Sequence, residues 1–301
     1  MRCIYCRPAH DLPDLEHPEL TPTEIASLVR VLVERYGLGK VRLTGGEPTR
    51  RSDLTEIISR LARIPGLQPL AMTTNGLTLA RRARQYAAAG LGRVNVSLDA
   101  VRPETYARLT GVDGLERVIE GIEAARAARL EPVRLNTVVV RGHNDDELVP
   151  ILRFAARRNL EIRFIELMPM GPLASHFSER YVSTQEIRRR IAGRVRDWQP
   201  LERAADAAER YVVTLGDGMR ATVGLISPMS RGFCDCCNRI RIGSDGRLFP
   251  CLMGRSTGSV LPALRPALDD ALLHRILTAG MAMKGARHPE QGESVMSHIG
   301  G

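Results

Sequence analysis

The chain has 301 residues, of which 44% are hydrophobic and 26% charged, proportions that are ordinary for a globular protein. A chain of this length can bury a full core and needs no disulfide framework. No apolar run approaches the ~20 residues that a spanning helix requires, so we expect a soluble protein without a membrane partner. Because no basic-then-apolar leader opens the sequence, we expect a cytoplasmic protein whose six cysteines are metal ligands or free thiols.

The net charge is +9, from 43 Lys and Arg residues against 34 Asp and Glu residues. This excess suits a polyanionic partner, such as nucleic acid, an acidic membrane or a phosphate-rich small molecule. The arginines are scattered along predicted helices, and five Phe and one Trp offer few rings on which bases could stack. We therefore expect no nucleic-acid partner.

The first predicted helix begins after Thr21, which can cap it, and has Pro22 in its first turn and Glu24 to complete a capping box. Gly37 is predicted to end it. Downstream, short apolar strands alternate with amphipathic helices. The predicted strands span residues 40–44, 69–76, 93–99, 133–140 and 161–167. The predicted helices between them span residues 54–64, 79–90, 114–128 and 146–158.

This alternation requires right-handed crossovers and a parallel sheet, so the first half is predicted to be a barrel, a partial barrel or a doubly wound sheet. Functional residues are then expected in the loops that follow the strands. Beyond residue 169 the alternation decays, and we predict a second region at residues 170–301 with a helix at 184–191 and a hairpin at 211–223. Residues 203–210 are predicted to be a linker or a poorly packed helix.

Cysteines gather near both ends of the sequence. Cys3 and Cys6 form a C-x-x-C pair, which is typical of half a metal site, and no strand is predicted before it. Cys234, Cys237 and Cys251 form a second set, in which a predicted hairpin brings the third thiolate to the other two. A structural zinc takes four ligands, whereas a 4Fe-4S cluster held by three leaves one iron open for a ligand. We therefore predict that the second set holds a 4Fe-4S cluster.

An alternative joins the first two cysteines to Cys234 and Cys237 in a single zinc site, which would leave Cys251 without a role. Cys236 lies between the other thiols of its turn and is interpreted as a bystander.

Arginines and glycines mark two further ligand-binding stretches. Arg239 and Arg241 alternate on a predicted strand, so both face one side and can bind a phosphate or the edge of a nucleobase. The alternative for this pair is a solvated strand face. The stretch TGGEP places Gly46 where the backbone can approach a ligand closely, next to the carboxylate of Glu47.

With these residues the sequence resembles the radical S-adenosylmethionine (SAM) superfamily, and within it the GTP 3',8-cyclase family of molybdenum cofactor biosynthesis. The stretches that carry the resemblance are RCIYC, VRLTGGEPTRR, MTTNG, RVNVSLDA, VRLNTVVVRGHNDDE, IRFIELMPMG, FCDCCNRIRIGSDGRLFPCL and MSHIGG. They cover nearly the whole chain. The superfamily motifs are generic, but the three-cysteine set followed by N-R-x-R and the diglycine end are specific to that family.

The resemblance implies an α/β fold: a partial (βα)6-type radical SAM barrel lacking its first strand over residues 1–169, and an α+β cluster-binding region over 170–301. It implies two 4Fe-4S clusters, with metal ligands Cys3, Cys6, Cys234, Cys237 and Cys251. The implied SAM-binding residues are Tyr5, Gly46, Ser97 and Met168. The implied GTP-binding residues are Arg42, Thr73, Arg134, Arg239 and Arg241. The implied catalytic residues are Gly300 and Gly301, at the tail.

The implied reaction converts GTP to (8S)-3',8-cyclo-7,8-dihydroguanosine 5'-triphosphate. Reductive cleavage of SAM would give a 5'-deoxyadenosyl radical that removes the ribose 3' hydrogen, and the resulting carbon radical would attack C8 of guanine. The implied partners are the substrate GTP, an electron donor and a downstream cyclic pyranopterin monophosphate synthase. The oligomeric state stays open, with a homodimer as one possibility.

The sequence departs from the family pattern at two points. The family's first motif is C-x3-C-x2-C, and its first cysteine is not in the sequence, so we expect Met1 to be an internal methionine of a longer, truncated protein. Arg134 stands where the family usually has lysine. The alternatives are a truncated, catalytically inactive remnant that binds GTP, and another radical SAM enzyme with an auxiliary cluster.

Overall fold

The computed structural model describes residues 1–6, 19–202 and 207–292. Its first helix, α1, spans Pro22–Tyr36 and confirms the predicted capping box. The backbone N–H of Glu24 donates to Thr21 Oγ1 at 3.2 Å, and the backbone N–H of Thr21 donates to Glu24 Oε2 at 2.8 Å. Gly37 ends the helix with φ +64°, a left-handed conformation that glycine adopts without strain.

The central sheet has eight strands in the order β1-β2-β3-β4-β5-β8-β7-β6. Strands β1 to β5 are parallel, which confirms the sheet predicted from the alternating pattern. β8 continues the sheet parallel to β5, and β7 and β6 follow as antiparallel strands. The bounds are β1 Arg42–Leu43, β2 Leu70–Thr74, β3 Leu91–Ser97, β4 Arg134–Val139, β5 Glu161–Glu166, β6 Val195–Pro200, β7 Ala208–Leu215 and β8 Arg220–Ile226.

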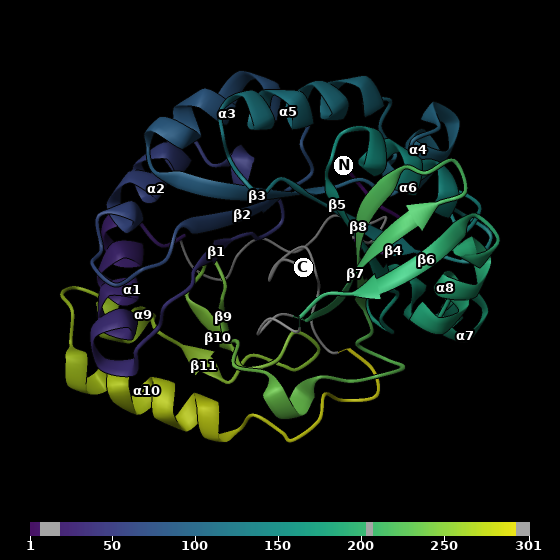
Figure 1. The fold of residues 1–301 in the computed structure, drawn as a ribbon. Coiled ribbons are helices and arrows are strands. Elements are labelled where there is room, and N and C mark those ends of the chain that lie inside the picture. The colour runs from purple at the N-terminus through teal and green to yellow at the C-terminus, as the bar shows by residue number, and fades with distance from the viewer. Residues whose placement is uncertain (7–18, 203–206, 293–301) are drawn as a thin grey trace.

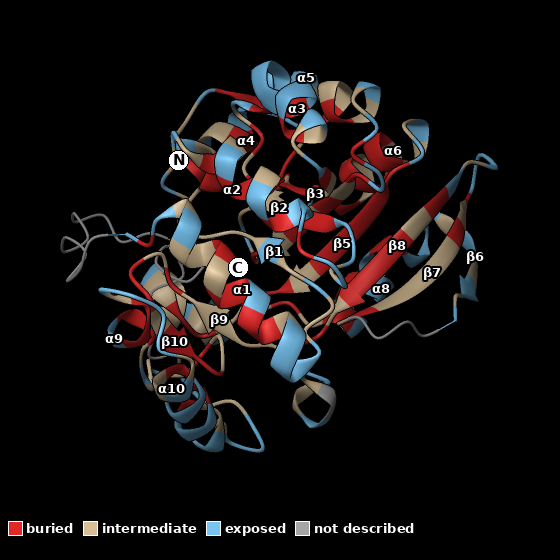
Figure 2. Cartoon of the chain, turned by 90° about the vertical axis from the view of Figure 1, so that its left-hand side faces the viewer, coloured by how far each residue is buried: buried red, intermediate tan, exposed pale blue. Residues whose placement is uncertain are grey.

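The sheet curves into a partial barrel whose outer side is covered by helices (Figure 1). The bounds of these helices are α2 Leu54–Ala62, α3 Leu79–Ala88, α4 Pro103–Thr110, α5 Leu115–Ala127, α6 Leu148–Arg157, α7 Phe177–Arg180 and α8 Thr184–Ala192. Figure 2 shows exposed residues on the outer helix faces and buried residues along the strands. The predicted mixed α/β partial barrel is therefore confirmed, while α4 and α7 had no counterpart among the predicted helices.

The carboxyl-terminal region adds a small antiparallel sheet of three strands in the order β11-β10-β9. Its elements are β9 Arg241–Ile242, β10 Arg247–Phe249, β11 Gly258–Ser259, α9 Leu261–Leu264 and α10 Asp270–Ala282. A second apolar cluster joins this region to the inner face of α1, where Leu28 and Leu32 pack in the same cluster as Leu248, Leu273 and Leu277. The first helix of the chain is therefore shared between the barrel and the carboxyl-terminal region.

The structure differs from the prediction within residues 207–223. The hairpin predicted at residues 211–223 is present as β7 and β8, but β8 inserts beside β5, so these strands extend the barrel sheet. The prediction of a linker or helix at 203–210 is wrong where the structure describes it, because β7 begins at Ala208 and pairs with β8. Residues 203–206 lie outside the described residues, and the boundary at residue 169 stays a prediction.

Short 3-10 turns complete the fold at Pro48–Arg50, Gly171–His176 and Cys234–Cys236. In the described part of the chain, none of the helices has the length and apolar character needed to cross a membrane.

We predict that Gly121→Ala destabilises the protein. A Cβ added at Gly121 on α5 would lie 2.6 Å from the carbonyl oxygen of Gly76 and 3.1 Å from Leu79 Cβ. The helix must then shift, and this overpacking costs about 1–3 kcal/mol, although alanine is otherwise the better helix residue. Urea denaturation measures the free energy of unfolding. The control is Gly39→Ala, since nothing lies within 4 Å of its added Cβ. Equal midpoints for the two variants would contradict the predicted close contact.

A second prediction concerns the ion pair between α1 and the carboxyl-terminal region. Arg265 donates Nε to Glu24 Oε1 at 2.6 Å and Nη2 to Glu24 Oε2 at 3.0 Å. The Arg265 guanidinium lowers the pKa of Glu24 from its ordinary value of 4.5 to about 2. Because the folded-state pKa is lowered, the stabilisation is complete above pH 4.5 and is lost as the pH falls towards 2.

Glu24→Gln is therefore expected to lower the free energy of unfolding at pH 7 by about 2 kcal/mol. The difference from the unsubstituted chain should shrink as the pH falls below 4.5. Glu34→Gln is the control, since Glu34 is exposed on the same helix. If the difference in the free energy of unfolding stays constant from pH 7 to pH 3, the Glu24 charge does not contribute to stability.

Candidate active site

A cavity of about 1300 Å³ lies inside the curved sheet, at the end where the parallel strands release their loops. Eleven of the predicted site residues line it, and they come from both halves of the chain. They are Cys3, Tyr5, Cys6, Arg42, Gly46, Thr73, Ser97, Arg134, Met168, Arg239 and Arg241. Cys234, Cys237 and Cys251 stand behind this lining rather than in it. Gly300 and Gly301 lie outside the described residues.

The Cys3–Cys6 segment is a tight turn held against the barrel. The backbone N–H of Cys6 donates to the carbonyl oxygen of Cys3 at 3.0 Å, so both thiols belong to one turn. The backbone N–H of Ile4 donates to the carbonyl oxygen of Leu109 at the end of α4. On the other side Gly171 approaches so closely that an added Cβ would lie 2.6 Å from the carbonyl oxygen of Tyr5. The sequence therefore needs a residue without a side chain at this point of the loop after β5.

Burial and nearby negative charge disfavour the thiolate form of Cys3. Burial raises its pKa to about 12, and the charges of Asp99 and Cys6 add to that effect. A metal cluster supplies the positive charge that stabilises such thiolates, because binding displaces their protons. The free Cys3 thiol is therefore protonated, and a metal bound at this turn would displace its proton.

Asp99, at the end of β3, fixes the side chain of Tyr5. The Tyr5 hydroxyl donates to Asp99 Oδ2 at 2.5 Å, and the backbone N–H of Val138 donates to Asp99 Oδ1 at 2.8 Å. Burial raises the pKa of Asp99 to about 6, although both hydrogen bonds oppose the shift. The Cys3–Cys6 turn is therefore joined through Asp99 to the loop after β3 and to the end of β4.

The glycine-rich loop after β1 places Gly46 in the cavity lining. Gly45 has φ +127°, a conformation that side chains rarely adopt. The Glu47 carboxylate binds the protein itself. It accepts hydrogen bonds from Thr74 Oγ1 at 2.7 Å and from the backbone N–H of Asn75 at 2.8 Å. This carboxylate therefore joins the loop after β1 to the end of β2 and the loop that follows it.

One wall of the cavity carries arginines that the sequence analysis mostly missed. Arg163 Nε donates to Glu161 Oε1 at 2.6 Å, Arg134 Nε donates to Glu161 Oε2 at 3.2 Å, and Arg210 Nη2 lies 3.2 Å from the same oxygen. Burial lowers the pKa of Arg134, and the charge of Arg163 adds to this. Arg93 lines the wall as well. The Glu161 carboxylate is thus shared by three arginines, with Arg93 as a fourth cation in the lining, which leaves the wall positively charged and suited to a polyanion.

The signal for these residues was present in the sequence. Arg163 and Asn136 are polar residues inside strands that otherwise read as apolar, and Arg163 is 2% exposed. A buried arginine within a strand points either to an ion pair or to a ligand. Arg210 could not be found this way, because it fell in the stretch predicted to be a linker.

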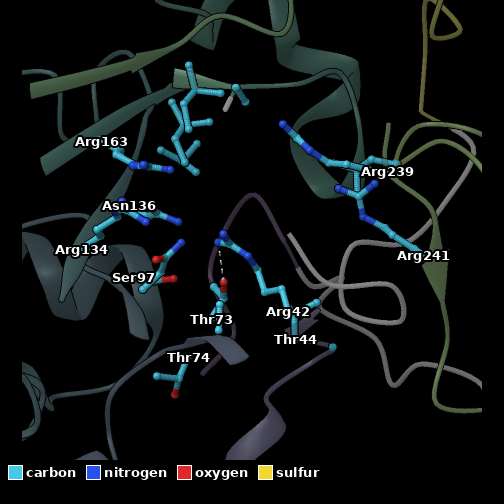
Figure 3. A pocket seen from close by; sticks show the side chains of 18 of the residues that line it. Arg42, Thr44, Thr73, Thr74, Ser97, Arg134, Asn136, Arg163, Arg239 and Arg241 are labelled. Atoms are coloured by element: carbon cyan, nitrogen blue, oxygen red, sulfur yellow. Dashed lines mark hydrogen bonds between the residues drawn. The ribbon is translucent and has the colours of Figure 1, made fainter. Parts of the chain in front are cut away.

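The opposite wall carries Arg239 and Arg241, with Arg42 between the two walls (Figure 3). Arg42 Nη1 donates to Thr73 Oγ1 at 3.4 Å, so these two predicted residues are brought together. Arg239 lies with its guanidinium carbon 5.2 Å from the ring centroid of Phe233. Burial lowers the pKa of Arg241, and the neighbouring charge of Arg239 adds to that shift. Both walls therefore hold cations that an anionic ligand would stabilise.

The second cysteine set occupies a turn like the first. The backbone N–H of Cys237 donates to the carbonyl oxygen of Cys234 at 3.0 Å. Burial raises the pKa of the Cys237 thiol, but the backbone N–H of Arg239 and the charge of Lys284 outweigh burial and lower it overall. Cys251 follows β10, and its thiol, like that of Cys237, acts electrostatically on Arg241. Two of the three thiols, those of Cys237 and Cys251, thus lie near Arg241.

Within residues 1–6, 19–202 and 207–292, no three Cys, His, Asp or Glu side chains already stand close enough together to hold a metal ion. The same finding covers both the predicted set of Cys234, Cys237 and Cys251 and the alternative four-cysteine zinc site, so it favours neither prediction. The side chain of Cys236 lies outside the described residues.

Glu166, at the end of β5, holds the segment that leads to the second cysteine turn. Its carboxylate is 1% exposed and accepts the backbone N–H groups of Thr184 at 2.8 Å, Met229 at 3.0 Å and Ser230 at 2.9 Å. The Ser230 hydroxyl donates to it as well. One buried carboxylate therefore positions the loop after β8 relative to the barrel.

Comparison with known families agrees with this architecture. A family model described as the Radical SAM superfamily matches residues 1–155, and one described as Molybdenum Cofactor Synthesis C matches residues 160–290. Streptococcus suis SuiB bound to the precursor peptide SuiA has a similar fold, with a TM-score of 0.58, 14% identity, and coverage of 91% of this chain and 63% of that chain. Fold and site together define a radical SAM protein.

Full-length relatives narrow the assignment. The GTP 3',8-cyclase of Heliobacterium modesticaldum is 38% identical over 310 residues, covering 100% of this chain and 94% of the relative. That of Moorella thermoacetica is 40% identical over 306 residues, with the same coverage. The chain belongs to the GTP 3',8-cyclase family, as the sequence predicted.

We predict that Glu166→Gln destabilises the protein by about 1–3 kcal/mol, because an amide nitrogen would replace one of the oxygens that accept buried N–H groups. Hydrogen exchange at residues 229 and 230 should become faster in the same variant, since these amides lose a charged acceptor. Glu56→Gln serves as the control, because Glu56 forms only an exposed pair with Arg60. Unchanged exchange at 229 and 230 would show that the carboxylate does not organise the loop.

Proposed function

We propose that this chain converts GTP to (8S)-3',8-cyclo-7,8-dihydroguanosine 5'-triphosphate in molybdenum cofactor biosynthesis. The observation that carries the proposal is a single cavity with a C-x-x-C turn at one edge and cationic walls on two sides. A triphosphate supplies the negative charge that these walls lack. The names of the relatives supply the reaction, and the cavity supports a nucleoside triphosphate as its substrate.

GTP would lie between the walls. Arg134 and its neighbours would bind the phosphates, and Arg239 and Arg241 would bind the guanine edge or phosphate oxygens. Arg42 and Thr73 would meet the nucleotide between them, as their position in Figure 3 supports. The arginine that replaces the family's usual lysine at position 134 keeps the positive charge but offers a planar fork, which Glu161 orients.

SAM would lie at the edge formed by the Cys3–Cys6 turn. The residues proposed to bind it are Tyr5, Gly46, Ser97 and Met168, which line the same cavity. When a 4Fe-4S cluster is bound at this turn, it supplies the electron that cleaves SAM. The chain's own contribution is to orient Tyr5 through Asp99, to hold the glycine loop through Glu47, and to exclude water from the cavity.

The remaining assignments are proposals of the same kind. We assign a second 4Fe-4S cluster to Cys234, Cys237 and Cys251, and a catalytic role to Gly300 and Gly301. We also propose a domain boundary near residue 169, a cytoplasmic location and a homodimer. The proposed partners are an electron donor and a downstream cyclic pyranopterin monophosphate synthase. All three cysteines are free thiols, and Lys284 and Arg239 lower the pKa of Cys237, which favours the thiolate form that a cluster binds.

The test is anaerobic reconstitution with iron and sulfide, followed by measurement of iron per chain and of nucleotide products with SAM, dithionite and GTP. Two clusters would give about eight irons per chain. We expect 5'-deoxyadenosine that depends on GTP, together with the cyclised nucleotide. Nucleotide binding with about four irons and no deoxyadenosine would instead favour an inactive GTP-binding remnant. Deoxyadenosine that forms without any GTP dependence would favour another radical SAM reaction.

Arg241→Met should abolish the cyclised product and weaken GTP binding by about 100-fold, because a buried cation that meets the nucleotide is lost. Equilibrium dialysis with GTP measures the affinity. Arg275→Met removes the same charge from the exposed face of α10 and is the matched control. Equal affinities in the two variants would place the nucleotide away from the Arg241 wall.

A further inference from the structure

Lys284 reaches the second cysteine turn from a distant part of the chain. Its ammonium group donates to the carbonyl oxygen of Cys237 at 2.9 Å, to the carbonyl oxygen of Arg239 at 3.0 Å and to the Cys237 sulfur at 3.5 Å. A lysine ammonium has three N–H groups, so these contacts use all of them. The side chain is only partly exposed, and it forms no ion pair with a described carboxylate.

The position of Lys284 is set by the packing of α10. Gly280 lies in the last turn of α10, four residues before Lys284, and approaches the small sheet so closely that an added Cβ would lie 2.4 Å from Leu248 Cδ2 and 2.8 Å from Thr257 Oγ1. The backbone N–H of Lys284 then donates to the carbonyl oxygen of Met281 at 3.0 Å, which continues the helical turn past its end. The close packing at Gly280 therefore delivers the ammonium to the cysteine turn.

Lys284 stands behind the cavity and does not line it. Its contacts bracket Asn238, with one carbonyl before that residue and one after it, so they fix the path of the backbone from Cys237 to Arg239. Arg239 does line the cavity. Lys284 therefore contacts the Cys237 thiol and the backbone of Arg239 but does not reach the cavity. Any effect of Lys284 on a ligand in the cavity must be exerted through these residues.

We propose that Lys284 is the positioning residue of the second cysteine turn, and that its hydrogen bond to the Cys237 sulfur raises the reduction potential of the cluster bound there. The inference rests on the proposed function for the presence of that cluster, but not for the positioning of the turn. Hydrogen bonds and positive charge at a cysteine sulfur stabilise the more negative, reduced state of an iron–sulfur cluster. Lys284 supplies both to one sulfur, while its two carbonyl contacts keep Arg239 directed into the cavity.

The first experiment uses the cluster-free chain and compares Lys284→Met, Lys284→Arg and Arg275→Met. Lys284→Met keeps the length of the side chain and removes its charge and its donors. We expect backbone hydrogen exchange across residues 234–241 to become about tenfold faster in Lys284→Met, since the loss of about 1.4 kcal/mol of protection corresponds to a factor of ten. Arg275→Met, which changes an exposed residue of the same helix, should leave the exchange unchanged.

The second experiment measures the reduction potential of the second cluster by a redox titration followed by electron paramagnetic resonance. Lys284→Met should lower that potential, and Lys284→Arg, which keeps a cationic donor, should restore it towards the value of the unsubstituted chain. A purely structural lysine would leave the potential of the assembled cluster unchanged. Faster exchange with an unchanged potential would overturn the electrostatic role, and unchanged exchange would overturn the positioning role.

The design separates this inference from the proposed function. If the unsubstituted chain takes up no second cluster, the cyclase proposal fails, and the exchange experiment still decides whether Lys284 positions the turn. If the unsubstituted chain takes up both clusters and cyclises GTP, while Lys284→Met matches it in exchange and potential, only the inference about Lys284 fails.

Discussion

The site depends on buried carboxylates at the ends of strands, which accept hydrogen bonds from the loops that follow. Asp99 holds Tyr5 and the end of β4, Glu166 holds the segments at Thr184 and Ser230, and the half-buried Glu47 joins two neighbouring loops. A carboxylate in a poorly hydrated place is costly unless several donors stabilise it. The donors here are mostly backbone N–H groups of loops, so the condition for burying each charge is that the loops take one conformation.

In the cavity, by contrast, Arg93 Nε and Arg210 Nε are buried without a hydrogen-bond partner among the described residues. Glu161 is shared by three arginines, and burial together with like charge lowers the pKa of both Arg134 and Arg241. Strand-end carboxylates are satisfied by the protein itself, whereas the cavity arginines need an external anion to stabilise them fully. The strand-end carboxylates therefore order the loops, while the cavity arginines present positive charge to a ligand.

Local patterns in the sequence predicted the local features well. The capping box at Thr21, the five parallel strands and the turns at both cysteine pairs depend on residues close together in the chain. Features that depend on distant pairing could not be predicted this way. The insertion of β8 beside β5, the sharing of Glu161 with Arg210, and the contact of Lys284 with Cys237 each join segments separated by tens of residues. A short motif indicates where the site lies, but only tertiary packing shows which side chains support it.

The final described segment of the chain joins the two halves of the site. Lys284 contacts the second cysteine turn, the ring of His288 bonds to the carbonyl oxygen of Pro228, and the backbone N–H of Gly292 donates to the carbonyl oxygen of Pro169 in the loop after β5. At Gly292 an added Cβ would lie 2.5 Å from Met170 Cβ, so the contact requires glycine. The segment thus runs from the proposed auxiliary cluster to the loop that carries Met168. A displacement of the second cysteine turn would therefore be transmitted along the backbone to the proposed SAM side of the cavity.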